Sequence, residues 1–171
     1  MKLTEESITP GVKSSVNAYL MARARAEVMT EKVDAVYEDI LTETPLYADL
    51  EMRGHDEPFQ ILKPKDMYLS TDEDFCAEVY AEANKRLREM GLKPDDMPDG
   101  HCPALVAQNL QRDCEWLIID NAAEMLGYDG KELHHKLLCA GLEKYHQFID
   151  LVCKLVVNLP DFENPLKRRA A

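Results

Sequence analysis

The stretch of residues 101–159 constrains the fold more than any other part of the sequence, because it reads as two long helices joined by a short turn. Pro103 suits the first position of a helix, where the backbone needs no N–H donor. Gly127 follows the last apolar residues of the first segment, as the left-handed residue of a C-terminal cap does. These signals predict a helix over residues 103–126. Its expected apolar face repeats at three- and four-residue steps and consists of Leu110, Cys114, Leu117, Ile118, Asn121 and Met125.

A second helix is predicted over residues 131–159. Asp129 and Glu132 are three residues apart and match a capping box at its start. No proline follows until Pro160, which ends the run. Because the connecting turn is short, we expect the two helices to be antiparallel neighbours. The second helix has an apolar stripe wide enough for at least two neighbours, formed by Leu133, Leu137, Leu138, Tyr145, Phe148, Ile149, Val152, Leu155 and Val156.

The remaining sequence completes an all-α fold. A chain of 171 residues is long enough for one domain with a buried core, and we predict a single all-α domain over residues 1–171. Residues 44–70 contain Gly54 and several prolines; this long irregular excursion is expected to pack across the helices and is a candidate binding element. The predicted architecture is a bundle of four main helices over about 10–43, 72–90, 103–126 and 131–159.

The chain is acidic, and its charge is unevenly distributed. The net charge is −12 at pH 7, with 22 acidic and 12 basic residues in positions 1–100, but 10 acidic and 8 basic residues in positions 101–171. Affinity for a nucleic-acid backbone comes from Lys and Arg, which displace counterions. We therefore expect no direct binding to nucleic-acid backbones. An acidic surface is compatible with a basic protein partner.

The sequence favours a cytoplasmic protein. It contains no apolar run of about 18 or more residues, the length that a membrane-spanning helix needs. Its first residues lack the apolar core of a signal peptide. The cysteines are scattered and number five, an odd count that fits a reducing compartment better than a disulfide framework. We predict no membrane association and a location in the cytoplasm.

The predicted last helix carries four candidate metal ligands: His135, Cys139, His146 and Cys153. On one continuous helix they fall within a sector of about 40°, and the four-residue step from His135 to Cys139 lets both reach one ion. Glu132 and Glu143 each precede a histidine at the Glu-x-x-His spacing of carboxylate-bridged di-iron bundles. The two motifs lie about 16 Å apart along one helix, so they cannot share one bimetal site. The alternative interpretation is a row of half-buried side chains at the edge of the apolar face.

Cys102 is a second candidate for chemistry. It precedes Pro103 at the expected start of a helix, where the helix dipole and the neighbouring His101 favour a thiolate. A cysteine nucleophile also needs an oriented base, and adjacency in sequence does not provide one. The alternative is a cysteine packed as a helix cap. The sequence contains no Cys-x-x-Cys, no phosphate-binding loop and no nucleophile elbow.

These features predict a non-enzymatic protein-interaction module without a cofactor, which acts through helix faces and the acidic N-terminal portion. Homo-oligomerisation is compatible with the sequence. The general pattern of the sequence resembles that of phage or mobile-element proteins. Two versions of the prediction are a virion or assembly component and an inhibitor of a basic host protein, in the host cytoplasm. The alternative prediction is a metal-dependent helical enzyme or sensor that uses the His/Cys edge of the last helix.

Overall fold

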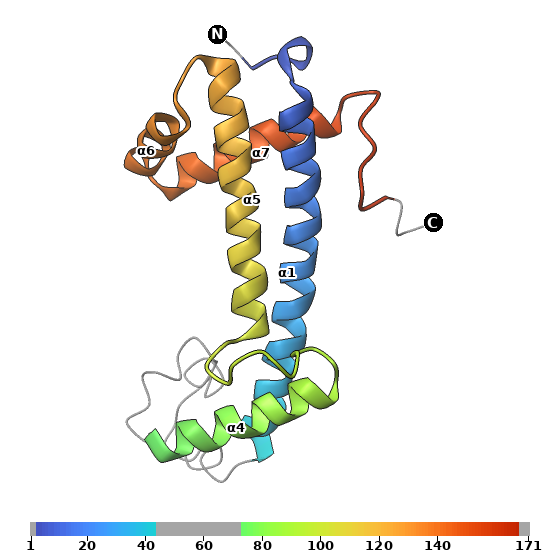
Figure 1. Ribbon diagram of the computed structural model, residues 1–171, viewed down its shortest axis with the longest axis vertical. Coiled ribbons are helices and arrows are strands. Elements are labelled where there is room, and N and C mark those ends of the chain that lie inside the picture. Colours follow the sequence, from blue (N-terminus) through green and yellow to red (C-terminus); the bar gives the residue numbers. More distant parts are fainter. Residues whose placement is uncertain (1–2, 44–72, 168–171) are drawn as a thin grey trace. The chain divides into compact units, whose positions relative to one another are not determined.

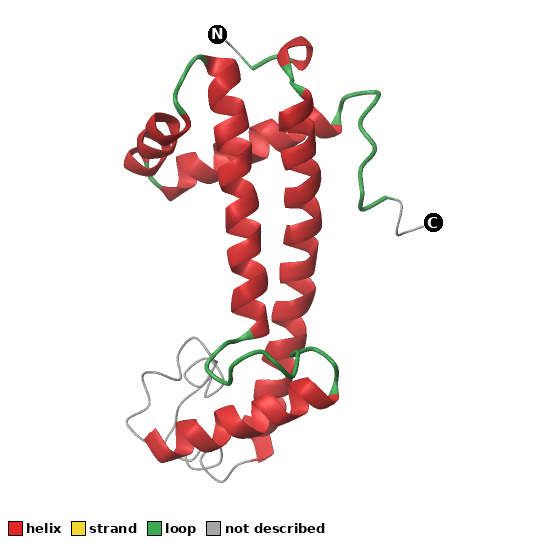
Figure 2. Ribbon diagram, viewed as in Figure 1, coloured by secondary structure: helices red, strands yellow, loops and turns green. Residues whose placement is uncertain are grey.

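A computed structural model of the chain describes residues 3–43 and 73–167, and within these ranges it contains helices and no strand (Figure 1, Figure 2). The predicted all-α fold class is confirmed. The excursion predicted over residues 44–70 lies outside the described residues. None of the described helices is both long and apolar enough to cross a membrane. The described elements are a short 3-10 helix Glu5–Ser7 and the α-helices α1 Pro10–Glu43, α4 Glu73–Glu89, α5 Pro103–Leu126, α6 Gly130–Ala140 and α7 Leu142–Val157.

The chain divides into two compact units. Unit 1 consists of Met1–Arg25 and Ala107–Ala171, and unit 2 consists of Ala26–Val106. Both α1 and α5 contribute residues to each unit. Since continuous helices are shared in this way, the single domain over residues 1–171 stays a prediction.

A proline opens each of the two long helices. The helix α1 begins at Pro10 and α5 begins at Pro103. At the start of α5, the backbone carbonyl of Cys102 accepts a hydrogen bond from the Val106 N–H at 3.0 Å. Proline loses no hydrogen bond at the first helical position, and it marks that position clearly in the sequence. The predicted bounds of α1 and α5 therefore match the observed ones, and those of α4 agree within one residue.

The core of unit 1 forms where α1, α5, α6 and α7 meet. In Figure 1, α7 crosses α5 and the first turns of α1. Ile118 and Ile119 of α5 and Val156 of α7 are completely buried, and burial of each such side chain is worth on the order of 2 kcal/mol. The buried members of this core are Val12, Val16, Tyr19, Ile118, Ile119, Ala122, Ala123, Met125, Leu133, Tyr145, Ile149, Val152, Cys153 and Val156.

The buried face of α5 is rotated away from the predicted one. Leu110 and Leu117 were expected to be buried, but they expose 56% and 49% of their surface. Ala122 and Ala123 are completely buried in their place. Small side chains let a neighbouring helix approach the backbone closely. A prediction based on the spacing of large apolar residues gives alanines little weight. The prediction is therefore wrong for the two leucines.

The prediction of one helix over residues 131–159 is also wrong, because the helix breaks at Gly141 into α6 and α7. The Gly141 backbone has φ 103° and ψ 158°, a combination that is essentially restricted to glycine. Its N–H donates to the Leu138 carbonyl and its carbonyl accepts from the Tyr145 N–H, both at 3.1 Å. Gly141 thus ends α6 and begins α7. The break turns the chain, so α7 crosses α5 instead of running antiparallel to it (Figure 1).

Replacing Gly141 with alanine is expected to lower the free energy of unfolding by about 1–3 kcal/mol, because a Cβ disfavours this backbone conformation. No heavy atom lies within 4 Å of a Cβ built at this position, so the loss would come from the backbone and not from a clash. Chemical denaturation followed by circular dichroism measures it. The control is Gly100→Ala, since Gly100 has no positive φ and a Cβ there also meets nothing within 4 Å. A Gly141→Ala protein that gains helix content without losing stability would contradict this account.

Candidate functional site

The first candidate site is a groove on unit 1, formed by the packing of α6 against α5. It has a volume of about 480 Å³. We call it the Trp116 groove. Its lining residues come from two helices and are Trp116 and Asp120 of α5, with Lys131, His134, His135 and Leu138 of α6.

The start of α6 is fixed by two local contacts. The Asp129 carboxylate accepts hydrogen bonds from the backbone N–H groups of Lys131 at 3.0 Å and Glu132 at 3.4 Å. The predicted N-terminal cap at Asp129 is thereby confirmed. Gly130 lies directly against the Asp120 side chain, where any Cβ would overlap the carboxylate. The first turn of α6 can therefore approach α5 closely, and this places the groove between the two helices.

An exposed indole lines the groove. Trp116 exposes 50% of its surface, and Leu138 exposes 57%. The His134 ring meets the Trp116 ring edge to face, with 5.8 Å between centroids and an angle of 81°. His134 Nε2 also lies 3.6 Å from Asp120 Oδ1, a pair that becomes a salt bridge when the imidazole is protonated. Aromatic and aliphatic surface beside charged groups is typical of the centre and rim of protein interfaces.

The structure separates the four candidate metal ligands. His135 and Cys139 remain together on α6, with Sγ 3.6 Å from Nε2. His146 lies exposed on α7. Cys153 also lies on α7, but within the core of unit 1. The Gly141 break accounts for the separation, because the sector of about 40° requires a continuous helix.

The His135–Cys139 pair supplies two of the four ligands that a structural zinc site takes. Within residues 3–43 and 73–167, no group of three or more His, Cys, Asp and Glu side chains is arranged to hold a metal ion. A metal site on this edge of the molecule stays a prediction.

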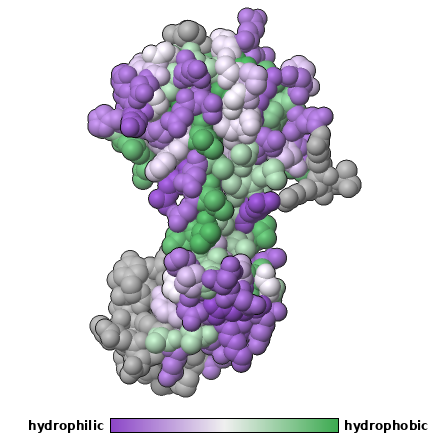
Figure 3. Space-filling view, viewed as in Figure 1, coloured by the Kyte–Doolittle hydropathy of each residue, from purple (hydrophilic) through white to green (hydrophobic). Residues whose placement is uncertain are grey.

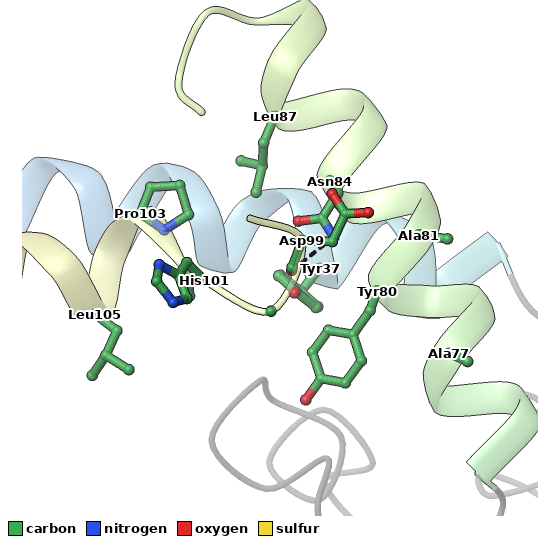
Figure 4. Close-up of a pocket in the computed structure, with 12 residues that line it drawn as sticks. Tyr37, Ala77, Tyr80, Ala81, Asn84, Leu87, Asp99, His101, Pro103 and Leu105 are labelled. Carbon is green, nitrogen blue, oxygen red and sulfur yellow. Dashed lines mark hydrogen bonds between the residues drawn. The ribbon is translucent and has the colours of Figure 1, made fainter. Parts of the chain in front are cut away.

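A second hollow lies in unit 2, beside α1, α4 and the segment that precedes α5 (Figure 4). Its volume is about 620 Å³, and its wall includes Tyr37, Tyr80, His101 and Cys102. We call it the Cys102 hollow. Burial raises the pKa of the Tyr37 hydroxyl, and the neighbouring Cys102 and Tyr80 raise it further. A volume of this size is within the range of small-molecule sites, roughly 300–1,000 Å³.

Cys102 itself is half-buried in this wall and lies at the predicted start of α5. Its backbone carbonyl accepts the first hydrogen bond of that helix, from Val106. The residue therefore has the position of a helix cap. A reactive thiol at Cys102 stays a prediction.

Lys93 supports one wall of the hollow, and the sequence does not indicate this role, since lysine is seldom buried. The residue is 2% exposed. The ammonium group donates hydrogen bonds to Asn84 Oδ1 at 2.6 Å and to the backbone carbonyls of His101 at 2.7 Å and Asp99 at 3.3 Å. Burial lowers the pKa of Lys93. These bonds hold the segment between α4 and α5 against α4, and so hold one wall of the Cys102 hollow.

Replacing Lys93 with methionine is expected to lower the free energy of unfolding by about 2–4 kcal/mol, because several buried oxygens would lose their donor. Urea denaturation measures the change. Lys85→Met on the exposed side of α4 is the control and should stay within about 0.5 kcal/mol of the parent. Equal stability of the two variants would show that the buried ammonium does not hold this segment.

Iodoacetamide is expected to modify Cys139 in the folded protein much faster than Cys153. Cys139 is exposed, whereas burial raises the pKa of the Cys153 thiol to about 12. Burial and the raised pKa together should make the reaction of Cys153 at least ~100-fold slower at pH 8. Mass spectrometry of the peptides measures both rates, and in denaturant the two rates should become similar. Rapid modification of Cys153 in the folded protein would refute its place in the core.

Comparison with known proteins gives no external guide to the function. No protein-family model matches the sequence, and no match was found among curated proteins or solved structures.

Proposed function

We propose that the chain is a non-enzymatic protein-interaction module, and that the Trp116 groove is its contact surface for another protein chain. The observation that carries this proposal is the position of Trp116. It is the single tryptophan of the sequence, and half of it is exposed in a groove beside Leu138. Tryptophan is enriched among the few residues that dominate the binding energy of protein interfaces, because covering its large ring removes much apolar surface from water.

The surroundings of the groove support the same proposal. Leu117 of α5 and Leu138 of α6 are both about half exposed, at 49% and 57%. Figure 3 shows hydrophobic side chains reaching the surface along α5 among hydrophilic ones. Contiguous apolar surface on a folded chain marks an interaction site more often than isolated apolar residues do. Asp120 and Lys131 line the same groove and would form the polar rim of the contact.

Unit 2 supports a basic protein as a further partner. It has 20 acidic and 8 basic residues, a net charge of −12, whereas unit 1 has 12 of each and a net charge of zero. Four acidic residues of α1 recur at four- and three-residue steps, so they lie within an arc of about 60° around the helix axis. They are Glu27, Glu31, Asp34 and Glu38. A basic partner would be attracted to this charge, and its affinity would fall as salt is added. A virion component and an inhibitor of a basic host protein are versions of this proposal that stay predictions.

The proposal is tested with three versions of the tagged chain as bait in extracts of its native cells: the parent, Trp116→Ala and Leu151→Ala. Leu151 of α7 is exposed to the same degree as Trp116, 50%, and is no part of the groove. A partner retained by the parent and by Leu151→Ala is then purified and its affinity for each version measured by calorimetry. Truncation of an interface tryptophan costs at least about 2 kcal/mol, so Trp116→Ala should bind at least ~30-fold more weakly.

Two results would contradict the proposal. One is a purified partner that binds Trp116→Ala as tightly as the parent. The other is an equal loss of affinity in Trp116→Ala and Leu151→Ala, which would mean that the groove has no special part in the contact. Circular dichroism of each version excludes unfolding as the cause of a loss.

A further inference from the structure

The exposed surface of α5 and α6 has two halves of opposite charge. The residues of each half lie within about 60° on their own helix and are exposed. The acidic half, on α5, consists of Asp113, Leu117, Asp120 and Glu124. The basic half, on α6, consists of Lys131 and Leu138, while the exposed Glu132 of the same helix is paired with Lys136 at 3.2 Å. Trp116 lies between the halves, in the groove that Asp120 and Leu138 also line. We call the whole the α5–α6 surface.

Each half pairs charge with an exposed leucine. Leu117 lies among the carboxylates of α5, and Leu138 lies on the same side of α6 as Lys131, in the same groove. Lys131 supplies the positive charge of the α6 half. A partner surface complementary to one half would need the opposite charge and an exposed apolar side chain. The other half has both.

We propose that the partner on this surface is a second copy of the chain, in a dimer with two-fold symmetry. This inference rests on the proposed function, since it names an occupant of the Trp116 groove. A two-fold axis through the α5–α6 surface places the acidic half of each copy opposite the basic half of the other. Both contacts are then attractive, and the two Trp116 side chains lie near the axis.

The distribution of charge over the chain favours self-association through unit 1. Two copies of a chain with a net charge of −12 repel each other at long range. Unit 1 has no net charge, because its 12 acidic residues are balanced by 12 basic ones. A contact through unit 1 therefore brings less electrostatic repulsion between the two copies than a contact through unit 2 would.

The size of the surface sets the expected affinity. Stable dimers bury about 800 Å² on each partner, and smaller contacts are weaker and often transient. The apolar part of the α5–α6 surface comprises one tryptophan and two leucines, each about half exposed, so charged side chains must supply the rest. We expect a dissociation constant on the order of 1–100 µM.

Sedimentation velocity of the purified full-length chain over ~1–300 µM tests the dimer, since this range spans the expected dissociation constant. The parent and Leu151→Ala should change from monomer to dimer together. Trp116→Ala should need at least ~30-fold more protein, because the tryptophan is lost from both copies. Trp116 is the single tryptophan, so its fluorescence should shift to shorter wavelength and resist acrylamide quenching as the dimer forms.

A pair of charge reversals tests the two-fold arrangement independently of Trp116. Asp113→Lys and Lys131→Glu should each dimerise roughly 10-fold or more weakly alone, because each places like charges opposite each other twice. An equal mixture of the two variants should recover the parent affinity. In the mixed dimer one contact has both charges reversed and the other has neither, so both contacts are attractive.

A parent chain that stays monomeric up to ~300 µM would overturn this inference, since that exceeds the expected dissociation constant. So would a dimer that persists unchanged in Trp116→Ala, or charge variants that recover nothing on mixing. Failure of the dimer can be distinguished from failure of the proposed function. A monomeric chain whose purified foreign partner still depends on Trp116 would retain the interaction module and exclude the second copy as its occupant.

Discussion

The backbone of Gly141 determines how unit 1 buries its apolar residues. With φ 103° and ψ 158° it ends α6 and lets the chain turn into α7. The turned α7 places Ile149, Val152 and Val156 in the same core as Ile118 and Ile119 of α5. A helix that continued past Gly141 would carry the residues of α7 along the direction of α6. The broad apolar stripe is thus divided between two helices, and each part is buried against different neighbours.

The packing of this core decides which apolar residues of α5 remain outside. Once the core has taken up Ile118, Ala122 and Ala123, the opposite side of α5 keeps Leu117 exposed, and Trp116 lies in the groove beside α6. Charge follows the same division of the molecule. Unit 1 has equal numbers of acidic and basic residues, and the whole net charge of −12 belongs to unit 2. The proposed contact through unit 1 and the proposed attraction of a basic partner to unit 2 therefore depend on different residues, and substitutions in one unit should leave the other property intact.

Much of the fold could be predicted from the sequence because capping signals are local. Pro10, Pro103 and Asp129 each fix a helix start through backbone groups within a few residues. Gly141 was missed because the apolar period continues on both sides of it, and one glycine inside a helical pattern is usually tolerated. Its unusual φ becomes visible only in the folded backbone.

The sites were harder to predict because they depend on contacts between distant residues. The rotation of the buried face of α5 follows from Ala122 and Ala123, which a pattern of large apolar residues undervalues. The grouping of His135, Cys139, His146 and Cys153 assumed a single helix, and only His135 and Cys139 remain in contact. The Trp116 groove needs α6 to fold back on α5, and nothing local to Trp116 indicates this.

We expect the Trp116 groove to be covered when the chain binds its partner. Hydroxyl-radical footprinting with mass spectrometry tests it directly, because the rate of side-chain oxidation follows exposure. Tyr128 is an internal reference, since it lies in unit 1, exposes 39% of its surface and lies under the Lys136 ammonium rather than in the groove. On complex formation, oxidation of Trp116 and Leu138 should fall several-fold, by about the factor expected for full burial of a half-exposed side chain, while that of Tyr128 stays constant. Unchanged oxidation of Trp116 in a fully formed complex would contradict the account.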